Sequence, residues 1–186
     1  MASVLAACDN LIGCFRGDLT FEDARRDRRY VLAEDGRSKP IKRIPGLALP
    51  DGSHLLDSSP LPLHLYDFAQ HIFHNHARPE ALVFYVPKLE NEEEAAYVKA
   101  LIAAAEAGIV ARFPGYQPGT VKVLVVFENP RAIFRINEMA AALPPHFIGG
   151  SLGWHDFLAS TARIKLCRKE RNSRWLEYVV TSPTCE

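Results

Sequence analysis

The sequence lacks both a long uninterrupted hydrophobic run and an excess of charge of either sign. No stretch reaches the roughly 18 apolar residues that a membrane-spanning helix needs, so we expect no membrane partner. Lysine plus arginine and aspartate plus glutamate balance at 22 each, so the overall charge does not favour a nucleic-acid partner. The 186 residues, 48% of them hydrophobic, are enough to bury one core.

Cysteine is scarce and carries no metal-binding pattern. The four cysteines have no Cys-x-x-Cys spacing, which predicts reduced thiols: Cys8, Cys14, Cys167 and Cys185. The first residues lack the basic stretch that opens a signal peptide, and Thr184-Cys185-Glu186 is no peroxisomal address. Together these absences predict a cytoplasmic protein.

What the sequence does contain is an alternation of apolar, strand-like runs with helical stretches. Strands are predicted at residues 39–49, 81–88, 120–128 and 146–153, and helices at residues 60–76, 90–110, 130–143 and 154–164. The strands are apolar almost throughout, which is typical of a parallel sheet covered on both faces. This order predicts an α/β protein built from parallel βα units of the TIM-barrel type.

Only about four βα units are visible, whereas a closed TIM barrel needs eight of them in roughly 250 residues. The pattern leaves three architectures open: about half a barrel that pairs with another copy, an open α/β fold, or a truncated barrel. We divide the chain into an N-terminal segment at 1–38, the βα units at 39–164 and a basic, irregular tail at 165–186. The arginine-rich run at residues 25–29 is interpreted as solvent-exposed.

Two carboxylates follow neighbouring strands of the predicted sheet. Glu128 ends one apolar run, and Asp156 follows the next. Because parallel strands bring their carboxyl ends to one edge, where barrel enzymes keep their catalytic groups, we expect these side chains to converge. Two converging carboxylates favour a hard divalent cation such as Mg²⁺, whereas two exposed loop residues are the alternative.

Five short motifs follow one another in a fixed order. They are Arg43-Ile-Pro-Gly46, Phe73-His-Asn75, Tyr85-Val-Pro-Lys88-Leu-Glu90, Gly119-Thr-Val-Lys122 leading to Glu128, and Gly153-Trp-His-Asp156. Each is weak alone, but their order, and the 28 positions between Glu128 and Asp156, resemble the malate synthase family. The chain departs from the family pattern at Leu47-Ala48 and at Asn129, and the resemblance fades after Ala162.

This resemblance implies a Mg²⁺-dependent acyltransferase of the glyoxylate cycle, which condenses acetyl-CoA with glyoxylate to give malate and CoA. By their place in the motifs, Glu128 and Asp156 would bind the metal, and Arg43 would stabilise the enolate oxygen formed from acetyl-CoA. Backbone N–H groups in the turn before Asp156 would contact the glyoxylate. The implied substrate-binding residues are Arg43, Glu128, Gly153, Trp154, His155 and Asp156.

The resemblance covers only the first half of the family's barrel. The family's catalytic base lies in a C-terminal domain that has no counterpart in this sequence. Two other functions therefore stay open: a Mg²⁺-dependent lyase of the citrate-lyase β-chain or HpcH type, and a barrel fragment without catalysis. Half a barrel leaves two sheet edges to be paired, so we expect a homo-oligomer.

Overall fold

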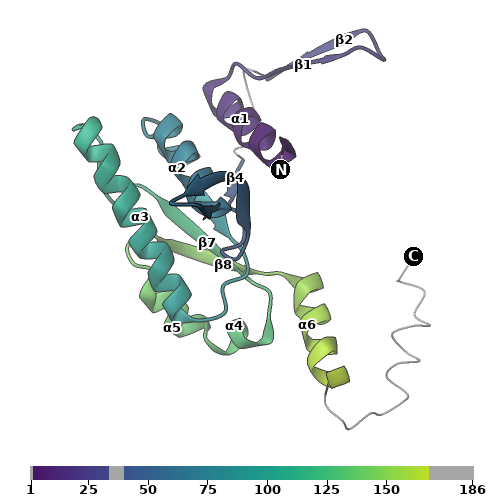
Figure 1. The fold of residues 1–186 in the computed structure, drawn as a ribbon, viewed down its shortest axis with the longest axis vertical. Helices are drawn as coiled ribbons and strands as arrows, with labels where there is room; N and C mark the ends of the chain where they lie inside the picture. The colour runs from purple at the N-terminus through teal and green to yellow at the C-terminus, as the bar shows by residue number, and fades with distance from the viewer. Residues whose placement is uncertain (1, 34–39, 168–186) are drawn as a thin grey trace.

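A four-stranded parallel sheet lies at the centre of the computed structural model, which describes residues 2–33 and 40–167 (Figure 1). Its strands stand in chain order: β3 (Lys42–Arg43), β6 (Val83–Val86), β7 (Lys122–Phe127) and β8 (Phe147–Leu152). Every neighbouring pair is parallel, which confirms the predicted βα units. Within the described residues the sheet stays open, with β3 and β8 at its edges, as expected for part of a barrel.

Helices follow the strands in the predicted order. They are α2 (Leu63–Asn75), η1 (Pro79–Ala81), α3 (Glu92–Arg112), α4 (Pro130–Phe134), α5 (Ile136–Ala142) and α6 (Trp154–Cys167). The single helix expected at 130–143 is broken at Arg135, whose φ of −117° and ψ of 17° are not helical and whose side chain pairs with Glu92 of α3. In the part of the chain that the structure describes, no helix is long and apolar enough to cross a bilayer.

Asparagine caps begin the helices that follow β6 and β7. Asn91 Oδ1 accepts a hydrogen bond from the Glu94 N–H at 2.9 Å, and Asn129 Oδ1 accepts one from the Ala132 N–H at 2.8 Å. Each cap satisfies an N–H that has no partner within its helix. Pro130 occupies the first helical position, where its missing N–H costs nothing. These local signals fix where the chain leaves β7 and turns into the next helix.

One face of the sheet is buried beneath the helices, and the other is open. The core joins strand residues to helix residues, among them Phe84, Val123, Val125, Ile72, Ile102 and Met139. Tyr85 and Leu124 point to the opposite face and are only half-buried. The prediction of a sheet covered on both faces therefore holds for one face within the described residues. In a closed barrel, side chains of the remaining strands would fill this inner face.

The N-terminal segment contains a helix and a hairpin that the sequence pattern did not predict. In α1 (Ala2–Arg16), Cys8 and Ile12 are buried where the helix packs on α2. The strands β1 (Thr20–Asp23) and β2 (Arg28–Val31) form a hairpin that projects from the rest of the molecule in Figure 1. The arginine-rich run lies in this hairpin and its turn, and it is exposed as interpreted.

A second unpredicted hairpin, β4 (Pro50–Leu56) and β5 (Ser59–Pro62), leads into α2. Its turn residues Asp57 and Ser58 both have positive φ, at 47° and 68°, as a two-residue turn of type I′ requires. Several prolines and the absence of an alternating pattern hid these strands.

The basic tail predicted at residues 165–186 falls almost entirely outside the described residues, since only 165–167 belong to the end of α6. The predicted limits of the three segments stay predictions.

Candidate functional site

The carboxyl ends of the four parallel strands bring charged side chains to one edge of the sheet. Arg43 ends β3, Lys88 follows β6 by two residues and Glu128 follows β7 directly. Asp156 lies in the first turn of α6, just after β8. Since the strands run in the same direction, these groups share the edge at which α/β barrels place their chemistry.

Gly153 allows α6 to begin directly against Glu128. Its N–H donates a hydrogen bond of 2.9 Å to the Phe127 carbonyl, which precedes Glu128 in the chain. A Cβ at position 153 would lie 2.4 Å from Glu128 Cβ and 3.0 Å from Glu128 Oε2, closer than real contacts allow. The contact therefore requires glycine, and it brings Asp156 beside Glu128.

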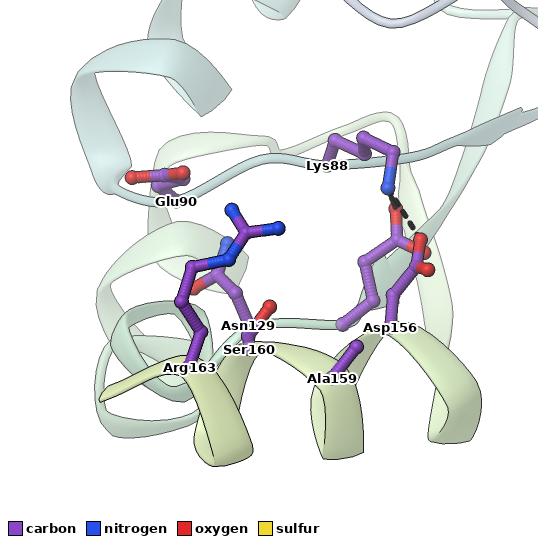
Figure 2. A pocket seen from close by; sticks show the side chains of 8 residues that line it. Lys88, Glu90, Asn129, Asp156, Ala159, Ser160 and Arg163 are labelled. Atoms are coloured by element: carbon purple, nitrogen blue, oxygen red, sulfur yellow. Dashed lines mark hydrogen bonds and ion pairs between the residues drawn. The ribbon is translucent and has the colours of Figure 1, made fainter. Parts of the chain in front are cut away.

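Lys88 bridges the two carboxylates. Its ammonium donates a short hydrogen bond to Asp156 Oδ2 and lies 3.7 Å from Glu128 Oε1 (Figure 2). The three side chains differ in exposure, with Glu128 only 6% exposed, Asp156 48% and Lys88 57%. The result is one buried and one half-exposed carboxylate joined by a single positive charge.

The pKa shifts follow from this arrangement. Burial raises the pKa of the Glu128 carboxyl, the positive charge of Lys88 acts against it, and the hydrogen bond with Asp156 raises it further. The hydrogen bond from Lys88 lowers the pKa of Asp156, and the same bond raises the pKa of Lys88. Asp156 and Lys88 are thus a charged pair, and Glu128 is the carboxyl that takes up a proton more readily.

A pocket of about 210 Å³ opens beside this group. It is lined by Lys88, Glu90, Glu128, Asn129, Asp156, Ala159, Ser160 and Arg163. Figure 2 shows Arg163 reaching from α6 toward the segment that carries Glu90 and Lys88, while Asp156 lies at the other end of the pocket. Two carboxylates lie at the Asp156 end, and the Arg163 guanidinium lies on the side of Glu90, a third carboxylate, so the pocket offers both signs of charge to a small anion bound with a cation.

The family model of the malate synthase TIM barrel domain matches residues 40–176. The chain belongs to the malate synthase family. A malate synthase of Arabidopsis thaliana is 31% identical over 158 residues, which cover 81% of this chain and 27% of that protein. A glyoxysomal malate synthase of Zea mays is 32% identical over the same shares, and one of Oryza sativa subsp. japonica is 30% identical over 87% of this chain and 29% of its own. The chain thus spans between a quarter and a third of these curated relatives.

Membership in the malate synthase family assigns the open sheet to a partial TIM barrel. The matched range also runs beyond residue 164 into the segment predicted as a basic tail. Of the residues that the sequence singled out, Glu128, Gly153 and Asp156 lie together. Trp154 and His155 occupy the first turn of α6 with exposed side chains.

Arg43 lies beside the pocket rather than in it. Its positive charge acts on both Lys88 and Asp156, but the side chain is exposed and does not line the pocket. Arg163 and Ser160 line it without having been predicted as site residues. Ser160 and Arg163 follow Asp156 by four and seven positions, so the helix predicted at 154–164 already places all three side chains on one face.

The two carboxylates fit a hard divalent cation of the kind that malate synthases use. Both offer oxygen ligands, and the buried Glu128 Oε1 has no hydrogen-bond partner. Across residues 2–33 and 40–167, no group of three or more His, Cys, Asp or Glu side chains is placed to hold a metal. The pair would therefore supply two ligands and leave the other positions to water and substrate.

Proposed function

We propose that this chain binds Mg²⁺ and glyoxylate and serves the condensation of acetyl-CoA with glyoxylate to malate and CoA. The observation that carries the proposal is the pair Glu128 and Asp156, at the carboxyl edge of a sheet that belongs to the malate synthase barrel domain. Because the chain spans 27–29% of the named relatives, the proposal concerns the part of the activity that these residues carry.

Glu128 and Asp156 would hold the metal. Bound there, Mg²⁺ supplies a Lewis acid that polarises the aldehyde of glyoxylate. The buried Glu128 Oε1 accepts no hydrogen bond, and the Lys88 ammonium lies 3.7 Å from it. Gly153 contributes by letting the start of α6 approach Glu128, so that both carboxylates face the same pocket.

The start of α6 would orient the glyoxylate carboxylate. The N–H groups of Trp154 and His155 belong to the first turn, where helical N–H groups have no partner within the helix and attract anions. Arg43 would stabilise the negative charge that develops on the enolate oxygen of acetyl-CoA. The new bond joins the methyl carbon of acetyl-CoA to the aldehyde carbon of glyoxylate, and thioester hydrolysis then releases CoA.

The base that removes the methyl proton is not assigned to this chain, because the resemblance places it in a further domain of the family. The lyase of the citrate-lyase β-chain or HpcH type is not favoured, since both the family model and the relatives point to malate synthase. Several relatives are named glyoxysomal, as in Zea mays, and the cytoplasmic location of this chain stays a prediction.

Titration of glyoxylate into the purified chain by calorimetry tests the proposal directly. We expect binding in the presence of Mg²⁺, none in EDTA, and a loss of the metal-dependent binding in Glu128→Gln. Glu80→Gln is the matched control, because Glu80 is exposed in η1, at the opposite end of β6. Folded protein that binds glyoxylate in neither condition would sink the proposal and favour a barrel fragment without catalysis.

A further inference from the structure

Lys88 occupies the space between the two carboxylates that a bound cation would share. Its ammonium contacts one oxygen of each carboxylate, Asp156 Oδ2 and Glu128 Oε1. Glu128 comes from the end of β7 and Asp156 from the start of α6, so one lysine joins two separate elements. In Figure 2, Lys88 reaches across to Asp156 from the segment that follows β6.

The backbone holds Lys88 in this position. Its φ of 61° lies in the left-handed region, which a lysine adopts only where the surrounding structure dictates it. The chain is anchored on both sides of it, because Val86, two residues earlier, is 1% exposed and Leu89, the next residue, is fully buried. The side chain itself is more than half exposed, so it can swing away while the backbone stays in place.

The charges explain why such a lysine competes with a metal. With both carboxylates ionised, the three groups carry a net charge of −1, which attracts cations and which the charge of Arg43 opposes. An ammonium and a divalent cation use the same oxygens, however, and cannot contact them at the same time. The apparent affinity for the metal is then reduced by the fraction of molecules in which the carboxylates are free.

We propose that Lys88 is a built-in substitute for the divalent cation: it holds Glu128 and Asp156 together in the metal-free protein and must leave them before a metal binds. Lys88 is a positioning residue in this role, since it acts through the two carboxylates. The inference rests on the proposed metal site. It adds that Lys88 lowers the affinity of this site for the metal and preserves the geometry of the site when no metal is bound.

Binding of Mn²⁺, followed by electron paramagnetic resonance and by calorimetry, tests the substitute role without any assay of turnover. Lys88→Met keeps the length of the side chain and removes its charge, so we expect Mn²⁺ to bind ~3- to 10-fold more tightly than to the unchanged protein. Lys88→Arg keeps the charge and should bind no more tightly than the unchanged protein. Lys99→Met removes the same charge from an exposed position on α3 and should have no effect.

A double-mutant cycle between Lys88→Met and Asp156→Asn gives a second measurement, of thermal stability. We expect the two substitutions to be coupled in EDTA, where the Lys88 ammonium contacts Asp156. Unchanged or weaker Mn²⁺ binding in Lys88→Met, or no coupling in EDTA, would overturn the inference. If the unchanged protein still binds glyoxylate with Mg²⁺ in that case, the proposed function stands; if no variant binds a metal, both fall.

Discussion

At the scale of single residues, Gly153 matters because Glu128 occupies the space that a side chain at position 153 would need. We predict that Gly153→Ala destabilises the protein by about 1–3 kcal/mol, because a Cβ placed 2.4 Å from Glu128 Cβ forces the turn away from β7. The same shift separates Asp156 from Glu128, so metal-dependent glyoxylate binding should weaken at least about tenfold, a loss of about 1.4 kcal/mol. Urea unfolding and calorimetry measure the two effects.

Gly108 supplies the control for this substitution. It lies within α3, and a Cβ there would meet nothing within 4 Å. Gly108→Ala should therefore stabilise the protein by roughly 0.5–1 kcal/mol through the better helix propensity of alanine, with glyoxylate binding unchanged. If both alanine variants behaved alike, the close approach at Gly153 would have no part in forming the site.

At the scale of elements, α2 is tied to the sheet by polar groups buried beneath it. His71 is fully buried, and its Nε2 donates a 2.9 Å hydrogen bond to the Ala81 carbonyl just before β6. Asp67 accepts a 2.7 Å hydrogen bond from Lys42 of β3, and this ion pair is almost inaccessible to solvent. Because a buried charge is costly once its partner is lost, these contacts make α2 sensitive to conditions that change ionisation.

The buried histidine predicts a loss of stability in mild acid. Burial lowers the pKa of His71 below 6.5, despite opposing contributions from the Ala81 carbonyl and Asp67. As the pH falls, this histidine is therefore protonated in the unfolded chain before it is protonated in the folded protein. Its contribution to the free energy of unfolding is complete above about pH 6.5 and declines as the pH falls below it. The slope should approach about 1.4 kcal/mol per pH unit for this histidine, measured by urea unfolding between pH 7 and 5.

Substitution separates His71 from the other groups that titrate in this range. His71→Gln keeps an N–H donor but cannot be protonated, so its stability curve should be flatter, with a residual slope from His64, whose pKa is also lowered by burial. His155→Gln removes an exposed histidine and should leave the curve unchanged. An equally steep curve in His71→Gln would show that another group controls the acid sensitivity.

The elements of the sheet could be predicted because their signals are local. The sequence shows the apolar runs that form β6, β7 and β8. It also shows the capped starts of α3 and α4. The break at Arg135 depends on a contact with Glu92 some 43 positions earlier, and no local pattern carries that information. The β4–β5 hairpin was missed for another reason, since its turn signal at Asp57-Ser58 is flanked by strands without alternation.

The candidate site likewise contains residues that the sequence could predict and residues that it could not. Glu128 and Asp156 were predictable because strand ends in a parallel sheet share an edge, and the motifs around them resemble a known family. The bridge from Lys88 was not, because it depends on a left-handed backbone conformation that the sequence does not favour. Arg163 falls within the helix predicted at residues 154–164, but no motif marks it as a site residue, and only its place beside the pocket does so.

At the scale of the whole molecule, the two edges of the sheet predict self-association. Both β3 and β8 are edge strands within the described residues, and Ile148 and Leu152 on β8 are each 52% exposed. Unpaired strand edges with apolar side chains favour pairing with another chain. We therefore expect light scattering to give a homo-oligomer for the purified chain; a well-folded monomer would contradict this expectation.

A charge on the edge should reverse the association. Ile148→Lys places an ammonium on β8, so the mass measured by light scattering should fall toward that of the monomer. Phe134→Lys is the matched control, because Phe134 is 83% exposed on α4, away from the strand edges, and its substitution should leave the mass unchanged. Equal effects of the two lysines would point to general solubility rather than to the strand edge.

The strand order β3-β6-β7-β8 also has a consequence for how the chain is made. Each strand of this sheet pairs with the strand of the same sheet that is synthesised before it, so it meets its partner as soon as it emerges. Each pairing closes a loop of about one βα unit, such as the 39 positions from Val83 to Lys122, rather than a loop across the whole sheet. A ribosome releasing the chain at roughly 5–20 residues per second would let each βα unit dock on its predecessor as it emerges. The carboxyl-edge cluster would then be assembled last, when Asp156 joins Lys88 and Glu128.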